Sequence, residues 1–288
     1  MIFREQVKEF TYHIGWRSRA RRPGRHNSTQ RGMGMEFRGH TTLLSYPDPR
    51  RIDIRQTIRD PFEQVYVRIF NQKSVTPVFV LCDLSGSMNY GVHQRKISVA
   101  ADITQSAAQS ATHTGDPFGF IGFDENIRED WLCPPSSRPH LAIEMAERLK
   151  DFHPAGVGCA GLKEAVRYLP RERSLVFIVS DFHMPLPELE DALVLMLRHH
   201  IVPVVLWDSS EYRNLPEFGI ASVTDSETGA KRTLFLRKDY RDRILQGFED
   251  RRKAIENLFL RFDMQPFFVE DGFDADLLTN YFHQYVAA

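Results

Sequence analysis

The chain has 288 residues, 42% of them hydrophobic and 26% charged, with a formal net charge of −1. These values are those of ordinary globular proteins and exclude a disordered or fibrous chain, and the length predicts one large domain or a domain with a smaller partner. No apolar run approaches the roughly 20 residues that cross a bilayer. The charged start, MIFREQVKEF, lacks the apolar core of a signal peptide, so a cytoplasmic protein is expected.

The charge is unevenly distributed along the chain. Residues 1–75 hold 15 Lys and Arg against 7 Asp and Glu, which leaves 22 basic and 31 acidic residues for 76–288. This asymmetry predicts a boundary near residue 75, between a basic N-terminal extension (1–75) and a larger domain (76–288). The densest basic stretch, WRSRARRPGR at 16–25, is one that nucleic acid could contact electrostatically, although such charge runs more often form solvated surface.

From residue 76 onward, apolar runs that are typical of buried strands alternate with segments of helical periodicity. The first half predicts a strand at 76–83, a helix at 94–113, a strand at 117–123, a short edge strand at 127–132, and helices at 140–152 and 162–169. The second half predicts a strand at 174–181, a helix at 187–200, a strand at 201–207, a hairpin at 221–236, a helix at 238–262, a strand at 265–269 and a helix at 274–285.

This order predicts the fold class. Alternating strands and helices form an α/β domain, a doubly wound and mainly parallel open sheet with helices on both faces. In such sheets, ligands bind outside the carboxyl ends of the strands.

Polar side chains follow two of these buried strands at the points where the strands end. The motif DLSGSM places Asp83, Ser85 and Ser87 on the turn after the first strand, and SLVFIVSD ends on Asp181. Because both turns belong to the same edge of the sheet, we expect the four side chains to meet. Carboxylate and hydroxyl oxygens are hard ligands that suit Mg²⁺ or Mn²⁺, so the sequence predicts a metal-binding and partner-binding site there.

The common catalytic signatures are missing from the sequence. It contains no phosphate-binding G-x-x-x-x-G-K-[ST] loop, no G-x-S-x-G and no H-E-x-x-H. A metal hydrolase also needs a base beside its bound water, and none is apparent. We therefore predict a protein without enzymatic activity. Two alternatives stay open, a nucleic-acid-binding module that uses the basic extension and a metal-dependent hydrolase of unrecognised type.

Two sets of motifs resemble known families. DLSGSM, with VFIVSDF later in the chain, resembles the metal-ion-dependent adhesion site (MIDAS) of von Willebrand factor A domains. The segment at 31–70 resembles the signature of domain-of-unknown-function family 58, which precedes such a domain. Its elements appear here as Glu36-Phe37, Tyr46, Arg50-Arg51-Ile52-Asp53 and Val67-Arg68. The resemblance implies a von Willebrand A-like domain preceded by a small β-rich extension.

The resemblance also implies a function. Members of family 58 are associated with MoxR-type AAA+ ATPases, in pairs thought to act as chaperones that insert metal or mature enzyme complexes, methanol dehydrogenase among them. The chain would then be an adaptor between such an ATPase and a client protein. Its metal, held by Asp83, Ser85, Ser87 and Asp181, would be a docking point for a partner carboxylate. On this reading, nucleic acid is not expected as a partner.

The sequence departs from the family pattern in one ligand. The family has a Gly-Gly-Thr-Asp-Leu segment whose threonine ligates the metal, whereas this chain has GVGCAGL at 156–162, with Ala160 where the threonine is expected. The adjacent Cys159 is a poor ligand for a hard ion. An incomplete Mg²⁺ or Mn²⁺ site is therefore predicted.

Overall fold

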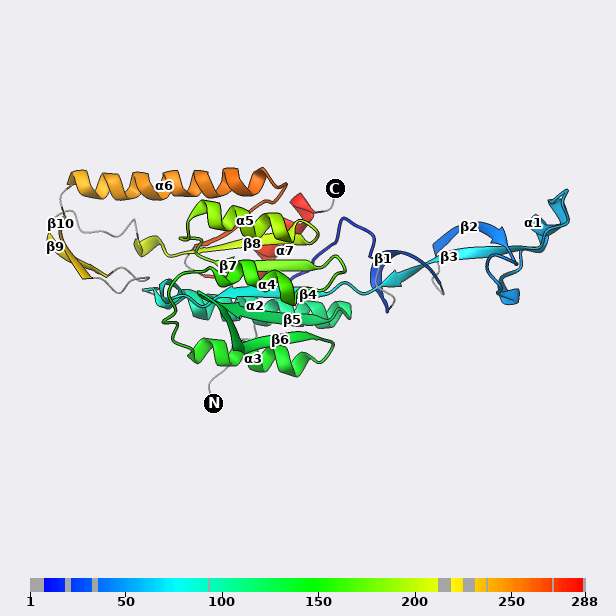
Figure 1. Cartoon of the computed structure of the whole chain (residues 1–288), viewed down its shortest axis with the longest axis horizontal. Helices are drawn as coiled ribbons and strands as arrows, with labels where there is room; N and C mark the ends of the chain where they lie inside the picture. The colour runs from blue at the N-terminus through cyan, green and yellow to red at the C-terminus, as the bar shows by residue number, and fades with distance from the viewer. Residues whose placement is uncertain are drawn as a thin grey trace. The chain divides into compact units, whose positions relative to one another are not determined.

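Figure 1 shows a computed structural model of the chain, which describes residues 8–18, 22–32, 36–92, 94–211, 219–224, 231–236, 238–270 and 272–286. Two compact units are present. The smaller unit comprises residues 14–76, and the larger unit combines the residues before 14 with those from 77 onward. The boundary between residues 76 and 77 lies close to the one that the charge distribution predicts. The boundary between residues 13 and 14 was not predicted.

The larger unit is built on a six-stranded sheet with the order β11-β8-β7-β4-β5-β6. Neighbouring strands are parallel except for β6, which lies antiparallel to β5 at one edge. All residues of β4, β5 and β7 are buried, as continuous apolar runs require of strands covered on both faces. The strands are β4 (Val78–Asp83), β5 (Phe118–Phe123), β6 (Ile127–Ser136), β7 (Leu175–Ser180), β8 (His200–Trp207) and β11 (Phe267–Glu270).

Helices cover both faces of this sheet, and Figure 1 shows α5 and α6 on one side and α2 and α3 on the other. Along β7, Val176 and Ile178 pack into the core beneath α4, α5 and α6, whereas Phe177 meets Phe282 of α7 on the opposite face. The helices are α2 (Lys96–Thr114), α3 (Pro139–Asp151), α4 (Gly161–Ala165), α5 (Leu186–Met196), α6 (Lys238–Leu260) and α7 (Ala275–Tyr285). The predicted doubly wound α/β fold is confirmed.

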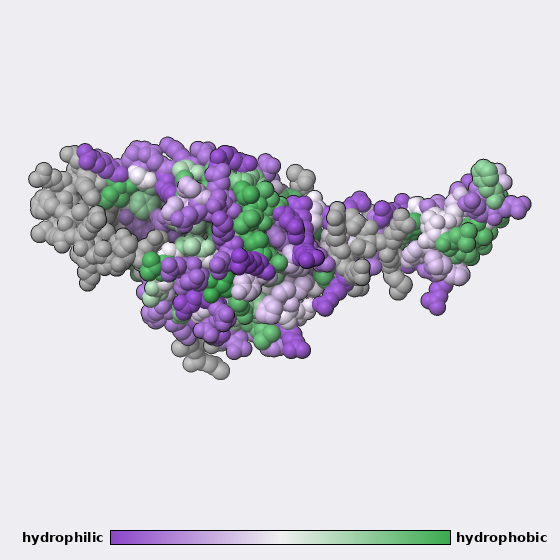
Figure 2. All heavy atoms as spheres, in the orientation of Figure 1, coloured by the Kyte–Doolittle hydropathy of each residue, from purple (hydrophilic) through white to green (hydrophobic). Residues whose placement is uncertain are grey.

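The predicted hairpin between β8 and α6 is also present. Strands β9 (Gly219–Thr224) and β10 (Lys231–Leu236) pair antiparallel as a separate two-stranded sheet; the predicted turn at 225–229 lies outside the described residues. No described helix is both long and apolar enough to span a membrane. Figure 2 shows mainly polar residues on the visible face of the larger unit, interrupted by smaller apolar patches.

Residues 8–13 belong to the larger unit because two aromatic side chains anchor them there. Phe10 is only 4% exposed and packs against Phe177 of β7 and Phe282 of α7, with ring centroids 5.7 and 5.9 Å apart. Its backbone N–H donates to Ser110 Oγ of α2 at 2.9 Å. The buried Tyr12 donates its hydroxyl to Asp116 at 2.5 Å. We predicted that this segment belongs to the extension, because the overall charge of residues 1–75 marks only the boundary near residue 75.

The smaller unit is a three-stranded antiparallel sheet with β3 in the centre. Its strands are β1 (Pro23–Gly32), β2 (Glu36–Thr42) and β3 (Tyr66–Ser74), and the short helix α1 (Ile54–Arg59) precedes β3. The predicted β-rich character of this part is confirmed. The basic stretch at 16–25 leads into β1, and residues 19–21 within it lie outside the described residues.

Two of the family signature residues, Asp53 and Arg68, belong to a polar cluster in the smaller unit that is centred on Asp53. This carboxylate accepts from Arg68 Nε at 2.7 Å and pairs with His40 Nε2 at 3.0 Å. It also accepts from the Gln56 N–H at 3.2 Å, which caps the start of α1. The bond from Arg68, with those from His40 and Gln56, lowers the pKa of Asp53.

The other signature residues lie around this cluster. The Arg51 guanidinium sits 5.0 Å from the Phe70 ring centroid, and Phe37 packs edge-on against the same ring. The exposed Arg50 donates its N–H to Asp48. Glu36 begins β2, and its side chain lies outside the described set.

Two substitutions separate the roles of Asp53. Asp53→Asn keeps an acceptor for the Gln56 N–H and removes the charge opposite Arg68, whereas Asp53→Ala removes both. We expect amide exchange in 54–59 to accelerate from wild type to Asn to Ala, because α1 depends on the cap and on the ion pair. Because the pKa of Asp53 is lowered in the folded state, its carboxylate stabilises the fold at pH values above the ordinary pKa near 4. This stabilisation is lost as the pH falls below that value. The wild-type advantage should thus shrink in acid, and equal exchange rates at neutral pH would contradict this assignment.

Candidate functional site

The predicted site residues come together at the carboxyl edge of the sheet. Asp83 ends β4 and Asp181 directly follows β7, and these two strands are neighbours. Ser180, the last residue of β7, donates its hydroxyl to Asp83 Oδ2 at 2.6 Å. This bond joins the two strand ends that carry the carboxylates.

The turn after β4 folds its polar side chains inward. The Ser85 N–H donates to Asp83 Oδ1 at 2.8 Å, and the hydroxyl oxygens of Ser85 and Ser87 lie 3.0 Å apart. Ser87 stands in a short 3₁₀ helix (Gly86–Asn89), and its hydroxyl helps to lower the pKa of Asp181. The Gly86 N–H donates to the Gly156 carbonyl at 2.8 Å, which ties the turn to the loop at 156–160.

All four predicted site residues are buried. Asp83 and Ser85 have no exposed surface, and Asp181 and Ser87 are 1% and 2% exposed. We expected a partner to contact Asp83, Ser85 and Ser87 directly, but in the structure their side chains are covered. The four side chains lie below the molecular surface at this edge of the sheet.

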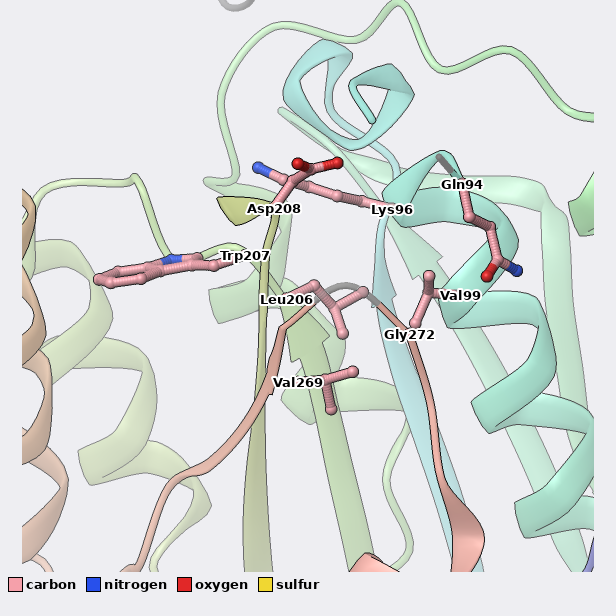
Figure 3. A pocket seen from close by; sticks show the side chains of 8 residues that line it. All are labelled: Gln94, Lys96, Val99, Leu206, Trp207, Asp208, Val269 and Gly272. Carbon is pink, nitrogen blue, oxygen red and sulfur yellow. The ribbon is translucent and has the colours of Figure 1, made fainter. Parts of the chain in front are cut away.

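The structure adds a cation that the sequence analysis did not identify. Lys96, the first residue of α2, is only 3% exposed, and its Nζ lies 3.0 Å from Asp181 Oδ2 and 2.6 Å from Glu211 Oε1. Glu211 ends a short 3₁₀ helix (Ser209–Glu211) after β8. Figure 3 shows Lys96 reaching from α2 toward the end of β8, where Asp208 stands, along a small hollow that both residues help to line.

Burial and charge set the protonation of the two aspartates in opposite directions. Burial raises the pKa of Asp83, and the negative charge of Asp181 raises it further. Burial also acts to raise the pKa of Asp181, but the charges of Lys96 and His183 and the hydrogen bond from Lys96 together outweigh it and hold that pKa below the ordinary value. The Lys96 pKa is raised despite its burial, because Asp181 and Glu211 favour the charged ammonium. Asp181 and Lys96 are therefore a buried ion pair.

The loop at 156–160 presents a thiol to the site. Cys159 is buried and donates Sγ–H to Asp83 Oδ2 at 3.2 Å, whereas Ala160 is exposed. Burial, with the charge of Asp83, raises the pKa of Cys159 well above that of a free thiol. The side chain that reaches the site from this loop is thus the neutral Cys159 thiol.

A strained residue completes the edge. Phe182 follows Asp181 with φ of +52°, a left-handed conformation that costs a non-glycine residue about 1–3 kcal/mol. Arg251 of α6 donates to the carbonyl oxygens of Phe182 and Met184, and Trp207 donates its indole N–H to the Asp181 carbonyl at 3.0 Å. These bonds hold the chain where it turns away from the site.

Sequence reasoning missed Lys96, Glu211, Ser180 and Arg251. Lys96 carried a readable signal, because Ala100, Ile103 and Ala107 follow it at helical spacing and are all buried. A lysine on that stripe needs a buried partner. Glu211 and Arg251 carried no comparable signal, since they approach the site only through tertiary structure.

Solved structures show only weak similarity to the chain. One similar solved structure is BatB from Bacteroides thetaiotaomicron, with 11% identity, a TM-score of 0.45 and coverage of 74% of this chain and 100% of that one. Another is a von Willebrand factor type A protein from Catenulispora acidiphila, with 17% identity, a TM-score of 0.40 and coverage of 77% of this chain and 44% of that one. Both scores are below 0.5, so the fold assignment rests on the strand order above.

Sequence relatives are more informative. An uncharacterized protein in the moxR 3′ region of Paracoccus denitrificans is 32% identical over 98 residues, which are 34% of this chain and 93% of that protein. The model of the family described as protein of unknown function DUF58 matches residues 47–254. Because this match spans well over half of the sequence, the chain belongs to the DUF58 family.

Proposed function

We propose that the protein is a non-enzymatic adaptor that docks a MoxR-type AAA+ ATPase and helps it to mature a client enzyme complex, by metal insertion or assembly. The observation that carries the proposal is the polar cluster at the carboxyl ends of β4 and β7. Its carboxylates are held by hydrogen bonds and by Lys96. The hydroxyl of Ser180 and the thiol of Cys159 donate to Asp83, but all three groups are buried and the thiol pKa is raised, so the arrangement supports binding rather than turnover.

The nature of the partner follows from the relative. The Paracoccus denitrificans protein is described by its position in the moxR 3′ region. Neighbouring bacterial genes often encode proteins that act together, and a MoxR-type ATPase is therefore the partner that we propose for this chain.

The docking surface is formed by exposed side chains above the buried cluster, which we call the rim: Tyr90, Val92 and Val157. They are 40%, 64% and 55% exposed. Tyr90 and Val92 are joined to the loop after β8, through Ser210 and Asp208, and Val157 follows Gly156, which is bonded to the turn after β4. Apolar side chains around a rigid polar centre resemble the make-up of interface hot spots.

The rim can be tested without disturbing the cluster beneath it. Val157→Asp places a charge on the rim, and Val194→Asp places the same charge on α5, where Val194 is 50% exposed. We expect Val157→Asp to weaken binding of a MoxR-type ATPase by about 1–3 kcal/mol, as measured by calorimetry with the full chain. Val194→Asp should leave the affinity within about 0.5 kcal/mol of wild type.

Asp83→Ala is a poorer test. It would leave the Ser85 N–H and the hydroxyl of Ser180 without their acceptor in a buried place. Loss of binding could then reflect loss of structure. If Val157→Asp and Tyr90→Ala both bind the ATPase with wild-type affinity, the rim is not the docking surface. If the wild-type chain does not bind the ATPase at all, the adaptor proposal itself is wrong.

A further inference from the structure

We infer that the site uses the ammonium of Lys96 as a built-in cation, in the role that a divalent metal ion has in the sites that this motif resembles. The residues around Asp83 and Asp181 do not fit a Mg²⁺ or Mn²⁺ ion, although the DLSGSM motif predicts one. The inference deepens the proposed docking site, and it can be tested without a partner protein.

The position of the ammonium is the first argument. Lys96 Nζ lies within hydrogen-bond distance of two carboxylates from different loops, Asp181 at 3.0 Å and Glu211 at 2.6 Å. It also lies 5.9 Å from the centroid of the Tyr90 ring, within the range of a cation–π contact. A buried ammonium that is bonded by two carboxylates already provides the positive charge that these acids need.

The occupied acceptors are the second argument. Asp83 receives the Ser85 N–H on one oxygen, and the donors of Ser180 and Cys159 on the other. Asp181 receives the Lys96 ammonium on Oδ2 and the His183 N–H on Oδ1. Each carboxylate oxygen that would ligate a metal ion thus already accepts from a protein donor.

The chemistry of the donors is the third argument. Hard dications select oxygen ligands, and a protonated thiol is a poor substitute. Cys159 is the side chain that the loop at 156–160 directs at Asp83. Within the described parts of the chain, no three His, Cys, Asp or Glu side chains are grouped so as to hold a metal ion.

Electrostatic repulsion is the fourth argument. A dication bound to Asp181 would share that carboxylate with the ammonium, so the two like charges would stand a few ångströms apart in a buried site. Such repulsion is large where water does not screen it. Metal and Lys96 therefore exclude each other unless the lysine leaves its position.

The test removes the ammonium and asks whether a metal ion replaces it. Mn²⁺ binding to the full chain is followed by electron paramagnetic resonance, and thermal unfolding is recorded with and without Mg²⁺. The variants are Lys96→Met and a control, Lys163→Met, which removes a surface lysine paired with Asp191. A further variant, Lys96→Met with Cys159→Thr, adds a hydroxyl where the thiol stands.

We expect wild type and Lys163→Met to bind Mn²⁺ no tighter than about 1 mM, with melting temperatures unchanged by Mg²⁺ to within about 1 °C. Lys96→Met should bind Mn²⁺ at least roughly tenfold tighter. Millimolar Mg²⁺ should raise its melting temperature by about 5 °C, because the ion stabilises the folded form alone. The Cys159→Thr addition should strengthen both effects.

Two results would overturn the inference: wild-type binding of Mn²⁺ at micromolar concentrations, or a folded Lys96→Met protein that binds it no better than wild type. Should Lys96→Met fail to fold without metal, the wild-type titration decides alone. The adaptor proposal is tested by a separate titration with the ATPase, so its failure would not change the Mn²⁺ results. If both proposals hold, chelating agents leave the adaptor–ATPase affinity unchanged.

Discussion

Replacing Phe10 with alanine is expected to destabilise the larger unit by about 3–5 kcal/mol. The side chain is almost fully buried and stacks between β7 and α7, against Phe177 and Phe282. Its removal leaves a cavity bounded by aromatic rings that belong to the rigid core of the sheet, so the site cannot readily collapse.

The measurement is chemical denaturation of the full chain, followed by near-ultraviolet circular dichroism. Thr11→Ala is the matched control, because Thr11 is exposed and only its backbone N–H is bonded, to Thr279. It should change stability by less than about 0.5 kcal/mol. A small effect of Phe10→Ala would mean that residues 8–13 do not belong to the larger unit. A chain that begins near residue 76 would then be as stable as the full chain.

Lys96→Met should destabilise the protein by a similar amount in metal-free buffer, roughly 3–5 kcal/mol, because it leaves the buried Asp181 and the partly buried Glu211 without their cation. Adding Asp181→Asn should recover part of this loss, since it removes one of the uncompensated charges. If Asp181→Asn restores stability to Lys96→Met, the loss came from a buried charge without a partner. If the loss came from poorer packing, the second substitution would lower stability further.

The control for this pair is Lys150→Met. Lys150 bonds Asp102 at 2.7 Å, but its side chain is 39% exposed, and surface ion pairs contribute at most about 1 kcal/mol. Denaturation midpoints of the four proteins suffice for the comparison. A Lys96→Met protein as stable as Lys150→Met would show that the buried ion pair contributes no more than a surface pair.

Much of the fold could be predicted because its signals are local. The buried runs at 76–83 and 174–181 can only be covered strands, and the elements around them follow from helical spacing and turns. The anchoring of residues 8–13 could not be predicted with confidence, because it depends on two aromatic side chains whose partners lie about 100 and 270 residues away. Only the alternation of Phe10 and Tyr12 hinted at it.

The site was predicted in its residues but not in its environment. Asp83, Ser85, Ser87 and Asp181 meet because parallel strands end at one edge, which is a rule of the fold. Their burial depends on how the turn and the loop at 156–160 close over them, and no spacing rule describes that. The role of Lys96 depends on the length of a flexible side chain and on Glu211, which arrives from a distant loop.

The pairing of residues 8–13 with α7 has a consequence for biosynthesis. Thr11 and Thr279, bonded through the Thr11 N–H, are separated by 268 residues, so Phe10 can pack against Phe282 only after α7 has left the ribosome. The residues of the smaller unit emerge in between and can pair their three strands first. The larger unit thus closes last, and its aromatic core is the part of the nascent chain that is exposed to chaperones and proteases for the longest time.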